Sequence, residues 1–346
     1  MSTEVLLLIL LFLGLLGLPM LPGCLELWRR RDSRPIEIDQ EATVNPREPG
    51  LAFRRGLASL VEVADTDLPV RAPIDRAGGQ TYEVHRELRL GPGARIPALL
   101  IALGAAEVGD AATLGDLYVR GEARLGAAIR LRALAVDGDV VLGQDSRVEN
   151  WIDTEASARI GPRCDLGRSA TAVKGLTLGA GCTFRRLGGL PVSTEGPARP
   201  PAGATLVEPG EPAERRIDDA LLWAGRRLTV PSGLTVDRDL IVHGEVRVGA
   251  GNVVRGSIKA YGGLHLDEGV RVEGNLICRR DIRIAGDATI RGNVYAEGDV
   301  AVGRGTRVGD ATAFKTVYAA GRIELAPDVL VFGWIVADRA GMVVGP

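Results

Sequence analysis

The sequence has few of the residues from which metal sites and most catalytic sites are built. Its 346 residues include three histidines, none in an HxxxH or HExxH spacing, and four cysteines, none in a CxxC pair. A zinc site is therefore not expected, and four scattered cysteines in a chain of this size do not suggest a disulfide framework. We predict no catalytic residue, no metal and no cofactor. The histidines are His85, His243 and His265, and the cysteines are Cys24, Cys164, Cys182 and Cys278.

Aromatic side chains and net charge are also scarce. Phe, Trp and Tyr make up 4% of the residues, and the formal net charge is -2. A chain without a basic excess gives no electrostatic argument for nucleic acid as a partner. Glycine, with 46 copies, is about twice as frequent as in an average protein. Many glycines and few aromatic residues fit poorly with a conventional globular core.

One long uncharged segment lies near the N-terminus. Val5–Leu25, "VLLLILLFLGLLGLPMLPGCL", is long enough to cross ~30 Å of hydrocarbon as a helix. It is followed by Trp28, which suits the membrane interface, and by the positively charged flank Arg29, Arg30 and Arg31. Only "MSTE" precedes it. By the positive-inside rule the long remainder faces the cytoplasm. We therefore predict a transmembrane anchor over residues 1–27, in a single-pass protein of the inner (cytoplasmic) membrane.

Two other interpretations of this segment stay open. A cleaved signal peptide requires positive charge before the apolar run and an A-x-A-like site after it, and neither is present. "LPGC" at 21–24 loosely resembles a lipoprotein cleavage box, which would make Cys24 an acylated terminus. Residues 28–80, rich in Pro, Arg, Glu and Asp, are expected to be a juxtamembrane linker with room for one short amphipathic helix.

The C-terminal part repeats with a fixed period. When it is written in rows of 18 that begin at Asp237, Arg255, Glu273 and Arg291, apolar residues fall in three straight columns, and the register slips once, at 309–313. The columns are Leu240, Ile258, Leu276, Val294; Val248, Leu266, Ile284, Val302; and Val254, Val272, Ile290, Val308. A repeat of this kind defines the fold before any other feature does.

The N-terminal half carries the same repeat less regularly, with an apolar residue followed by Gly once in each period. Some periods are one residue shorter than in the C-terminal part. A Pro-rich stretch then interrupts the pattern. The expected organisation is an irregular repeat segment at 81–187, a Pro-rich linker or loop at 188–218, and a regular segment at 219–346. The apolar-Gly pairs are Leu90-Gly91, Val108-Gly109, Leu125-Gly126, Leu142-Gly143, Ile160-Gly161 and Leu178-Gly179.

The repeat predicts an all-β fold. Apolar and polar residues alternate within each row, as in "VRV" and "IRI", and Gly or Gly-Asp separates the short runs. Three short strands and three corners in ~18 residues form one coil of a β-solenoid, whose coils stack at ~4.8 Å and bury their inner residues only against their neighbours. A β-sandwich would explain the alternation but not the fixed period.

The rows that contain "VRGSIKAYGGLHLDEGVRVEGNLIC" and "IRGNVYAEGDVAVG" resemble the bactofilins, bacterial polymer-forming cytoskeletal proteins. The resemblance is best over 219–346 and weaker over 81–187. It implies a right-handed β-helix, nucleotide-free assembly of a homopolymer end to end, and a non-enzymatic scaffold at the membrane, with cell-envelope or morphogenesis proteins among its partners. The chain departs from the family in its second, irregular half, its transmembrane segment and its length.

An enzymatic alternative rests on the element Leu/Ile/Val-Gly-x-x-small-x, as in "LGAGCTF" and "VGRGTRV". It resembles the hexapeptide repeat of left-handed β-helix acyltransferases. Those enzymes carry the motif on all three sides of each coil and use a general-base histidine. Here the motif marks about one side, and no histidine is expected beside a carboxylate near a loop.

The candidate polymer interface is the final turn, "FGWIVADRAGMVVGP". Phe332, Trp334, Met342 and Val343 gather there in a chain otherwise poor in large apolar residues. The open edge of a solenoid must be capped or paired, and we expect the outer edge of this turn to have no neighbouring strand. These side chains either contact a second copy of the chain or fold over the end as a cap; both interpretations stay open.

Overall fold

The computed structural model describes residues 45–66, 71–73, 81–196 and 226–345. These residues form one helix and a β-solenoid of about 13 coils. No helix among them is long and apolar enough to cross a membrane. The anchor predicted at 1–27 and its flank Trp28–Arg31 lie outside the described residues.

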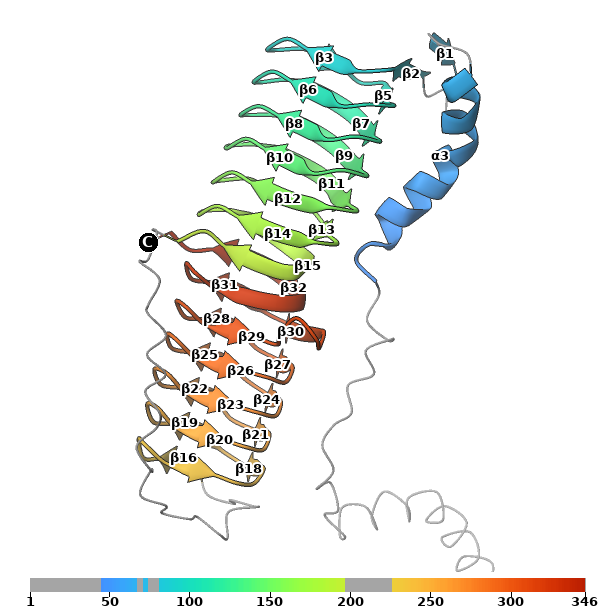
Figure 1. The fold of residues 1–346 in the computed structure, drawn as a ribbon. Coiled ribbons are helices and arrows are strands. Elements are labelled where there is room, and N and C mark those ends of the chain that lie inside the picture. The colour runs from blue at the N-terminus through green and yellow to red at the C-terminus, as the bar shows by residue number, and fades with distance from the viewer. Residues whose placement is uncertain (1–44, 67–70, 74–80, 197–225, 346) are drawn as a thin grey trace, which may run out of the picture. The chain divides into compact units, whose positions relative to one another are not determined.

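The strands fall into two arms (Figure 1). The N arm, residues 81–196, contains β2 (Thr81–His85), β3 (Leu88–Leu90), β4 (Arg95–Ile96), β5 (Leu99–Ala102), β6 (Ala106–Val108), β7 (Thr113–Val119), β8 (Ala123–Leu125), β9 (Arg130–Val136), β10 (Val140–Leu142), β11 (Arg147–Thr154), β12 (Ser157–Ile160), β13 (Ser169–Ala172), β14 (Gly175–Leu178) and β15 (Thr183–Thr194). Outside the arms lie helix α3 (Glu48–Thr66) and β1 (Arg71–Pro73).

The C arm covers residues 226–345. It contains β16 (Arg227–Val230), β17 (Thr235–Val236), β18 (Leu240–Val242), β19 (Glu245–Val248), β20 (Val253–Val254), β21 (Ile258–Ala260), β22 (Leu264–Leu266), β23 (Arg271–Val272), β24 (Leu276–Cys278), β25 (Ile282–Ile284), β26 (Thr289–Ile290), β27 (Val294–Ala296), β28 (Val300–Val302), β29 (Arg307–Val308), β30 (Lys315–Ala319), β31 (Arg322–Leu325) and β32 (Leu330–Val343).

Within each arm, every strand pairs in parallel with the strand one coil further on. Leu240 lies opposite Ile258, Ile258 opposite Leu276, and Leu276 opposite Val294. The next step runs from Val294 to Val317, so the slip in register is accommodated between β29 and β30. In the N arm the strand series β6, β8, β10 and β12 follows the shorter and longer periods expected there. The predicted columns and register are confirmed.

The core is a stack of Leu, Ile, Val and Ala side chains, most of them fully buried, that runs through both arms. Cys278 occupies the same column as Ala260, Ala296 and Ala319 and, like Cys164 and Cys182, is a buried free thiol. These three cysteines are therefore small core residues. Because each buried branched side chain contributes roughly 1.5–3 kcal/mol, the stacking of coils is itself the main stabilising interaction.

One corner of each coil is a tight turn with a residue in the left-handed region. The φ angles at these corners lie between 57° and 77°. Half of the twelve positions are not glycine; Ala128 and Arg163 are examples, at 57° and 58°. A single left-handed residue lets the chain turn sharply, so successive strands stay short. The positions are Gly93, Ala111, Ala128, Asp145, Arg163, Gly181, Gly233, Gly251, Gly269, Asp287, Gly305 and Asp328.

Another corner of the C arm carries a ladder of polar side chains. The amide N–H of Ser257 donates to the Asp239 carboxylate, and that of Asn275 donates to the Ser257 hydroxyl. The amide N–H of Asn293 then donates to the Asn275 side chain at 2.8 Å, and that of Thr316 to Asn293 at 2.8 Å. Since each side chain accepts from the backbone of the next coil, the ladder fixes the spacing at this corner.

The segment expected as a linker at 28–80 contains α3, which packs on the outer face of the N arm. Phe53, Leu57 and Val61 form its apolar stripe and meet Ile101, Tyr118 and Trp151 in a second, smaller core. The rings of Phe53 and Trp151 lie edge to face, 5.2 Å apart. The helix therefore belongs to the folded unit, covering a face whose outward residues are apolar.

Ion pairs also fix α3 in place. Asp153, on β11, is 1% exposed and receives hydrogen bonds from the guanidinium groups of both Arg47 and Arg54. Arg54 also reaches Asp137 at 2.9 Å and the Val136 carbonyl at 2.7 Å. Burial lowers the pKa of Arg54, but its hydrogen bonds to Asp137 and Asp153 outweigh this and raise it.

The two arms meet at their C-terminal coils. β15 of the N arm pairs antiparallel with β32 of the C arm, although the strands inside each arm pair in parallel with one another. Figure 1 shows the two strands side by side between the green and red coils. We call this contact the junction. It leaves each arm with its N-terminal coil as its outer end.

Candidate functional site: the junction, the outer ends and a groove

The four residues of the candidate polymer interface all lie in β32, at the junction. Val343 is 1% exposed and belongs to the core, whereas Met342 is 42% exposed. The ring of Trp334 packs against Phe314 at 5.2 Å, and the guanidinium of Arg307 lies 6.0 Å from the ring of Phe332. Val343 thus belongs to the core of the last coil, whereas Met342 lies at its surface.

The expectation that this coil has no neighbouring strand on its outer edge is wrong. Residues 330–342 of β32 lie opposite residues 183–193 of β15, with Thr183 opposite Met342 and Gly188 opposite Trp334. The amide of Gly181 donates to the Val343 carbonyl at 2.8 Å, and the amide of Val343 donates to Cys182 at 2.9 Å. The sequence alone gives no sign of this pairing, because most of the C arm separates the two strands in the chain. A polymer contact made by the four residues stays a prediction.

The two surfaces of the junction are complementary in shape. Each places a large aromatic ring of one strand over a glycine of the other: Trp334 over Gly188, and Phe184 over Gly341. A methyl group at Gly188 would lie 2.6 Å from the Trp334 ring. Both glycines therefore leave space for a side chain of the opposite arm.

Apolar and polar contacts continue the core across the junction. Leu187 lies opposite Ile335 and Val192 opposite Val331, all fully buried. The Thr194 hydroxyl donates to the Ala326 carbonyl at 2.7 Å and accepts from the amide N–H of Val329 at 2.9 Å. The arms are thus joined by core packing, backbone pairing and one buried hydroxyl.

The outer end of the N arm is partly polar. Glu83 and His85 of β2 lie in the columns that continue inward with Leu100 and Ala102, both fully buried. The Nε2 atom of His85 is 3.5 Å from the Glu83 carboxylate. β1 also pairs antiparallel with β2. On the other two sides of this coil, β3 and β4 pair with strands on one edge only among the described strands.

The outer end of the C arm is apolar. Among the strands that the structure describes, β17 and β18 have a partner on one edge only, β20 and β21 respectively. Leu240 and Val242 of β18 are buried core residues where the N arm has Glu83 and His85. Leu228 and Leu234 pack against the core but are only partly buried. The two outer ends therefore differ in chemistry.

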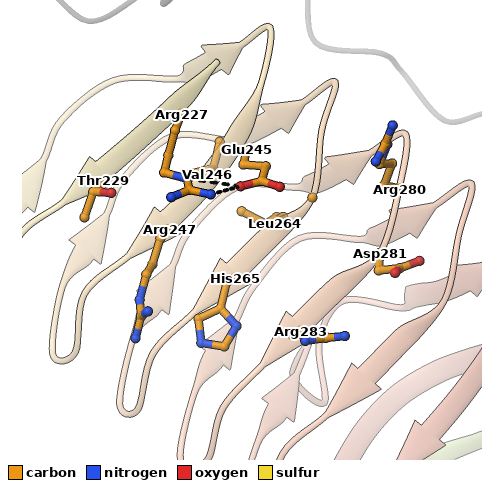
Figure 2. A pocket seen from close by; sticks show the side chains of 11 residues that line it. Arg227, Thr229, Glu245, Val246, Arg247, Leu264, His265, Arg280, Asp281 and Arg283 are labelled. Carbon is orange, nitrogen blue, oxygen red and sulfur yellow. Dashed lines mark hydrogen bonds and ion pairs between the residues drawn. The ribbon is translucent and has the colours of Figure 1, made fainter. Parts of the chain in front are cut away.

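An open groove of about 800 Å³ crosses the outward face of β16, β19, β22 and β25. Figure 2 shows Arg247, His265 and Arg283 in line on successive strands. Arg227 pairs with Glu245 at 2.8 Å, and Arg247 pairs with Asp267 at 3.1 Å. Four arginines line the groove against the carboxylates of Glu245 and Asp281, so its lining carries a modest positive charge.

The histidines do not come together, but two of them have carboxylate neighbours. The Nε2 atom of His265 lies 2.9 Å from Asp267, at the corner that follows β22. The expectation that no histidine sits beside a carboxylate near a loop is therefore wrong. His243 instead stacks on Tyr261, with ring centroids 5.0 Å apart. Among the described residues, no group of three or more His, Cys, Asp or Glu could hold a metal ion.

Comparisons with protein-family models, with curated proteins and with solved structures found no match for this chain.

Proposed function

We propose that this protein is a membrane-anchored, non-enzymatic scaffold that self-assembles through the ends of its β-helix, as the resemblance to bactofilins suggests. In this proposal the β-helix is right-handed and the polymer forms without nucleotide. The uncharged segment Val5–Leu25 and the arginines after it support a single-pass anchor with the solenoid in the cytoplasm.

The observation that carries this proposal is the closure of the junction. Because β15 and β32 cover each other, the strand edges that remain among the described strands belong to the outer coils, one of each arm. Partly buried Ile96 at one end and Leu234 at the other pack against the apolar core where it stops. A strand edge beside an interrupted apolar column is the surface to which a further coil can add.

The test places a charge at each outer end. Ile96→Lys and Leu234→Lys are each expected to stop growth at one end, so that each single variant gives at most paired molecules and the double variant gives single chains. Val141→Lys is the matched control, because Val141 is 45% exposed in the middle of the N arm. Sedimentation of the full-length protein in detergent and negative-stain microscopy report the size. Unchanged assemblies in the double variant would refute end-to-end growth.

A second candidate is an acyltransferase of the hexapeptide type. It is favoured by one observation, the pairing of His265 with Asp267 inside the groove, since a carboxylate that orients an imidazole is a usual feature of a general base. Against it, the tight left-handed turns mark one corner of each coil rather than all three. We therefore place the scaffold first.

A further inference from the structure

We infer that the junction is also an assembly surface: the C arm of one chain can pair with the N arm of a second chain through the same β15–β32 contacts. This exchange of arms uses a surface separate from the outer ends. It goes beyond end-to-end growth and does not depend on it. Exchange of an identical element between copies needs no new contacts, since the contacts already exist within one chain.

The junction differs from all other contacts between coils in its connectivity. Consecutive coils of one arm are joined by a few residues at each corner, so no coil can change partners without unwinding the arm. β15 and β32, by contrast, belong to arms that are linked only by the chain between Thr194 and Arg227. The junction is therefore the one contact between coils, in the part of the chain that the structure describes, that two folded arms can make or break as whole bodies.

An open junction is unfavourable for both arms. Opening exposes Leu187 and Val192 on the N arm and Val331 and Ile335 on the C arm, all now fully buried. It also leaves the edges of two long strands without partners, and such edges readily pair with another chain. Each arm consequently needs a partner at this surface, either from its own chain or from another.

The length of the connection permits both arrangements. The C arm has six coils, counted on the face of β16, β19, β22, β25, β28 and β31, and at ~4.8 Å per coil it measures roughly 29 Å. The chain between Thr194 and Arg227 can reach about 110 Å when extended. Pairing within one chain is favoured at low concentration, because the connection holds the two arms at an effective concentration in the mM range. The fraction of junctions that form between chains rises with the local concentration of chains, for example on a membrane.

A disulfide across the junction reports which chain supplies each arm. Thr183 and Met342 are directly opposite each other in the antiparallel pair, and both are exposed. Cα atoms of such pairs lie about 4.5–5.5 Å apart, within the range that a disulfide spans. Thr183→Cys and Met342→Cys would be made in separate full-length chains with different affinity tags, each with Cys24→Ser. The remaining cysteines are buried and are kept.

The two variants are produced together in one cell, and the membranes are oxidised and run on a non-reducing gel. A chain with both substitutions is the positive control, because it closes within itself and shows that the junction accepts the bond. Thr183→Cys produced with Val141→Cys is the negative control, because Val141 lies on the outside of the N arm. A third sample mixes the two variants only after separate purification.

Exchange predicts a band of twice the chain mass that carries both tags, at least tenfold stronger than in the negative control. The band should grow with expression level and be absent from the sample mixed after purification at low concentration, where each junction closes within its own chain. Complete closure of the doubly substituted chain, with no such band above the negative control at any expression level, would overturn the inference. The test of the outer ends stays separate from this one when its sedimentation is run on dilute protein in detergent, where each junction closes within its own chain.

Discussion

Gly188 of β15 lies directly beneath the ring of Trp334 of β32, at the point where the two arms meet. A Cβ atom at position 188 would lie 2.6 Å from Cζ3 and 2.7 Å from Cε3 of the Trp334 ring, and 3.2 Å from a Thr171 methyl group. Real Cβ atoms do not approach ring carbons so closely, so the ring or the strand would have to move. The contact depends on glycine because of the space that it leaves.

We therefore expect Gly188→Ala to loosen the junction. Overpacking of a well-filled contact costs typically about 1–3 kcal/mol, and this range applies to the free energy of unfolding of the variant. Gly91→Ala is the matched control, because a Cβ atom at Gly91 meets nothing within 4 Å. Urea unfolding followed by circular dichroism measures both. Equal free energies of unfolding for the two alanine variants would contradict the role given to the glycine.

A prediction for α3 compares two neighbouring arginines. Arg54 pairs with the buried Asp153, whereas Arg55 is 66% exposed and, among the described residues, pairs with Glu48 at the surface. Arg54→Met leaves the Asp153 carboxylate with Arg47 as its remaining cation. Loss of a buried partner costs roughly 3–5 kcal/mol when the charge is left uncompensated, so the expected loss lies at or below the lower end of this range. Arg55→Met should cost less than about 1 kcal/mol. Thermal unfolding of both variants tests this, and a similar melting temperature for the two would refute the assigned role of Asp153.

The coil repeat could be predicted because apolar residues recur in the sequence with a nearly constant period. A column residue such as Leu276 lies opposite Ile258 and Val294, its equivalents one period before and one period after. Residues one period apart in the sequence are therefore neighbours in the structure, and the predicted steps in both arms match the register of the strands. Helix α3 has no such signal, because its partners on β9 and β11 lie several coils away in the sequence.

The junction could be predicted only in part. The concentration of Phe332, Trp334 and Met342 in the last coil marked this end as either a contact surface or a cap, because aromatic residues and Met are otherwise rare in the chain. The partner could not be found, since antiparallel pairing of β32 with β15 breaks the parallel period on which the prediction rests. Gly188 and Gly189 in "RLGGLP" look like a loop signal, yet they lie within a strand, and Gly188 makes room for Trp334.

Substitution of the histidines distinguishes the scaffold hypothesis from the acyltransferase hypothesis. We expect His85, His243 and His265, replaced together by Gln, to leave assembly and folding intact, since none of them lies in the junction and a neutral, polar Gln replaces His85 at the outer end of the N arm. Single His265→Gln and Asp267→Asn variants remove the pair in the groove. The purified wild-type protein is assayed for transfer of an acyl group from acyl-coenzyme A to an amine or a hydroxyl acceptor. If it is active, and both single variants lose the activity while keeping the wild-type melting temperature, the acyltransferase replaces the scaffold as the preferred function.

The predicted orientation of the chain in a membrane rests on its arginines. Arg29, Arg30 and Arg31 follow the apolar segment and only Glu4 precedes it, so residues 26–346 should be cytoplasmic. A C-terminal green fluorescent protein should fluoresce, and a C-terminal alkaline phosphatase should be inactive. Replacing the three arginines by Asn and adding three Lys after Met1 should weaken or reverse both signals. Phosphatase activity in the unmodified chain would refute the topology.

The last prediction concerns the alkaline limit of stability. The Tyr318 hydroxyl donates to the Asp338 carboxylate at 2.6 Å, and this hydrogen bond, helped by partial burial, raises the pKa of Tyr318 to about 12. In an unfolded chain the pKa of tyrosine is about 10. Since the folded state holds the proton more tightly, the contribution of Tyr318 to stability is complete below about pH 10 and is lost as the pH rises from 10 to about 12.

Tyr318→Phe removes this contribution at every pH. The difference in melting temperature between the wild-type protein and this variant should therefore be constant up to about pH 10 and shrink towards pH 12. Tyr295→Phe is the matched control, because the Tyr295 ring stacks on Tyr318 at 4.9 Å but its hydroxyl meets no carboxylate among the described residues. A difference that stays constant to pH 12 would mean that the proton between Tyr318 and Asp338 does not contribute to folding.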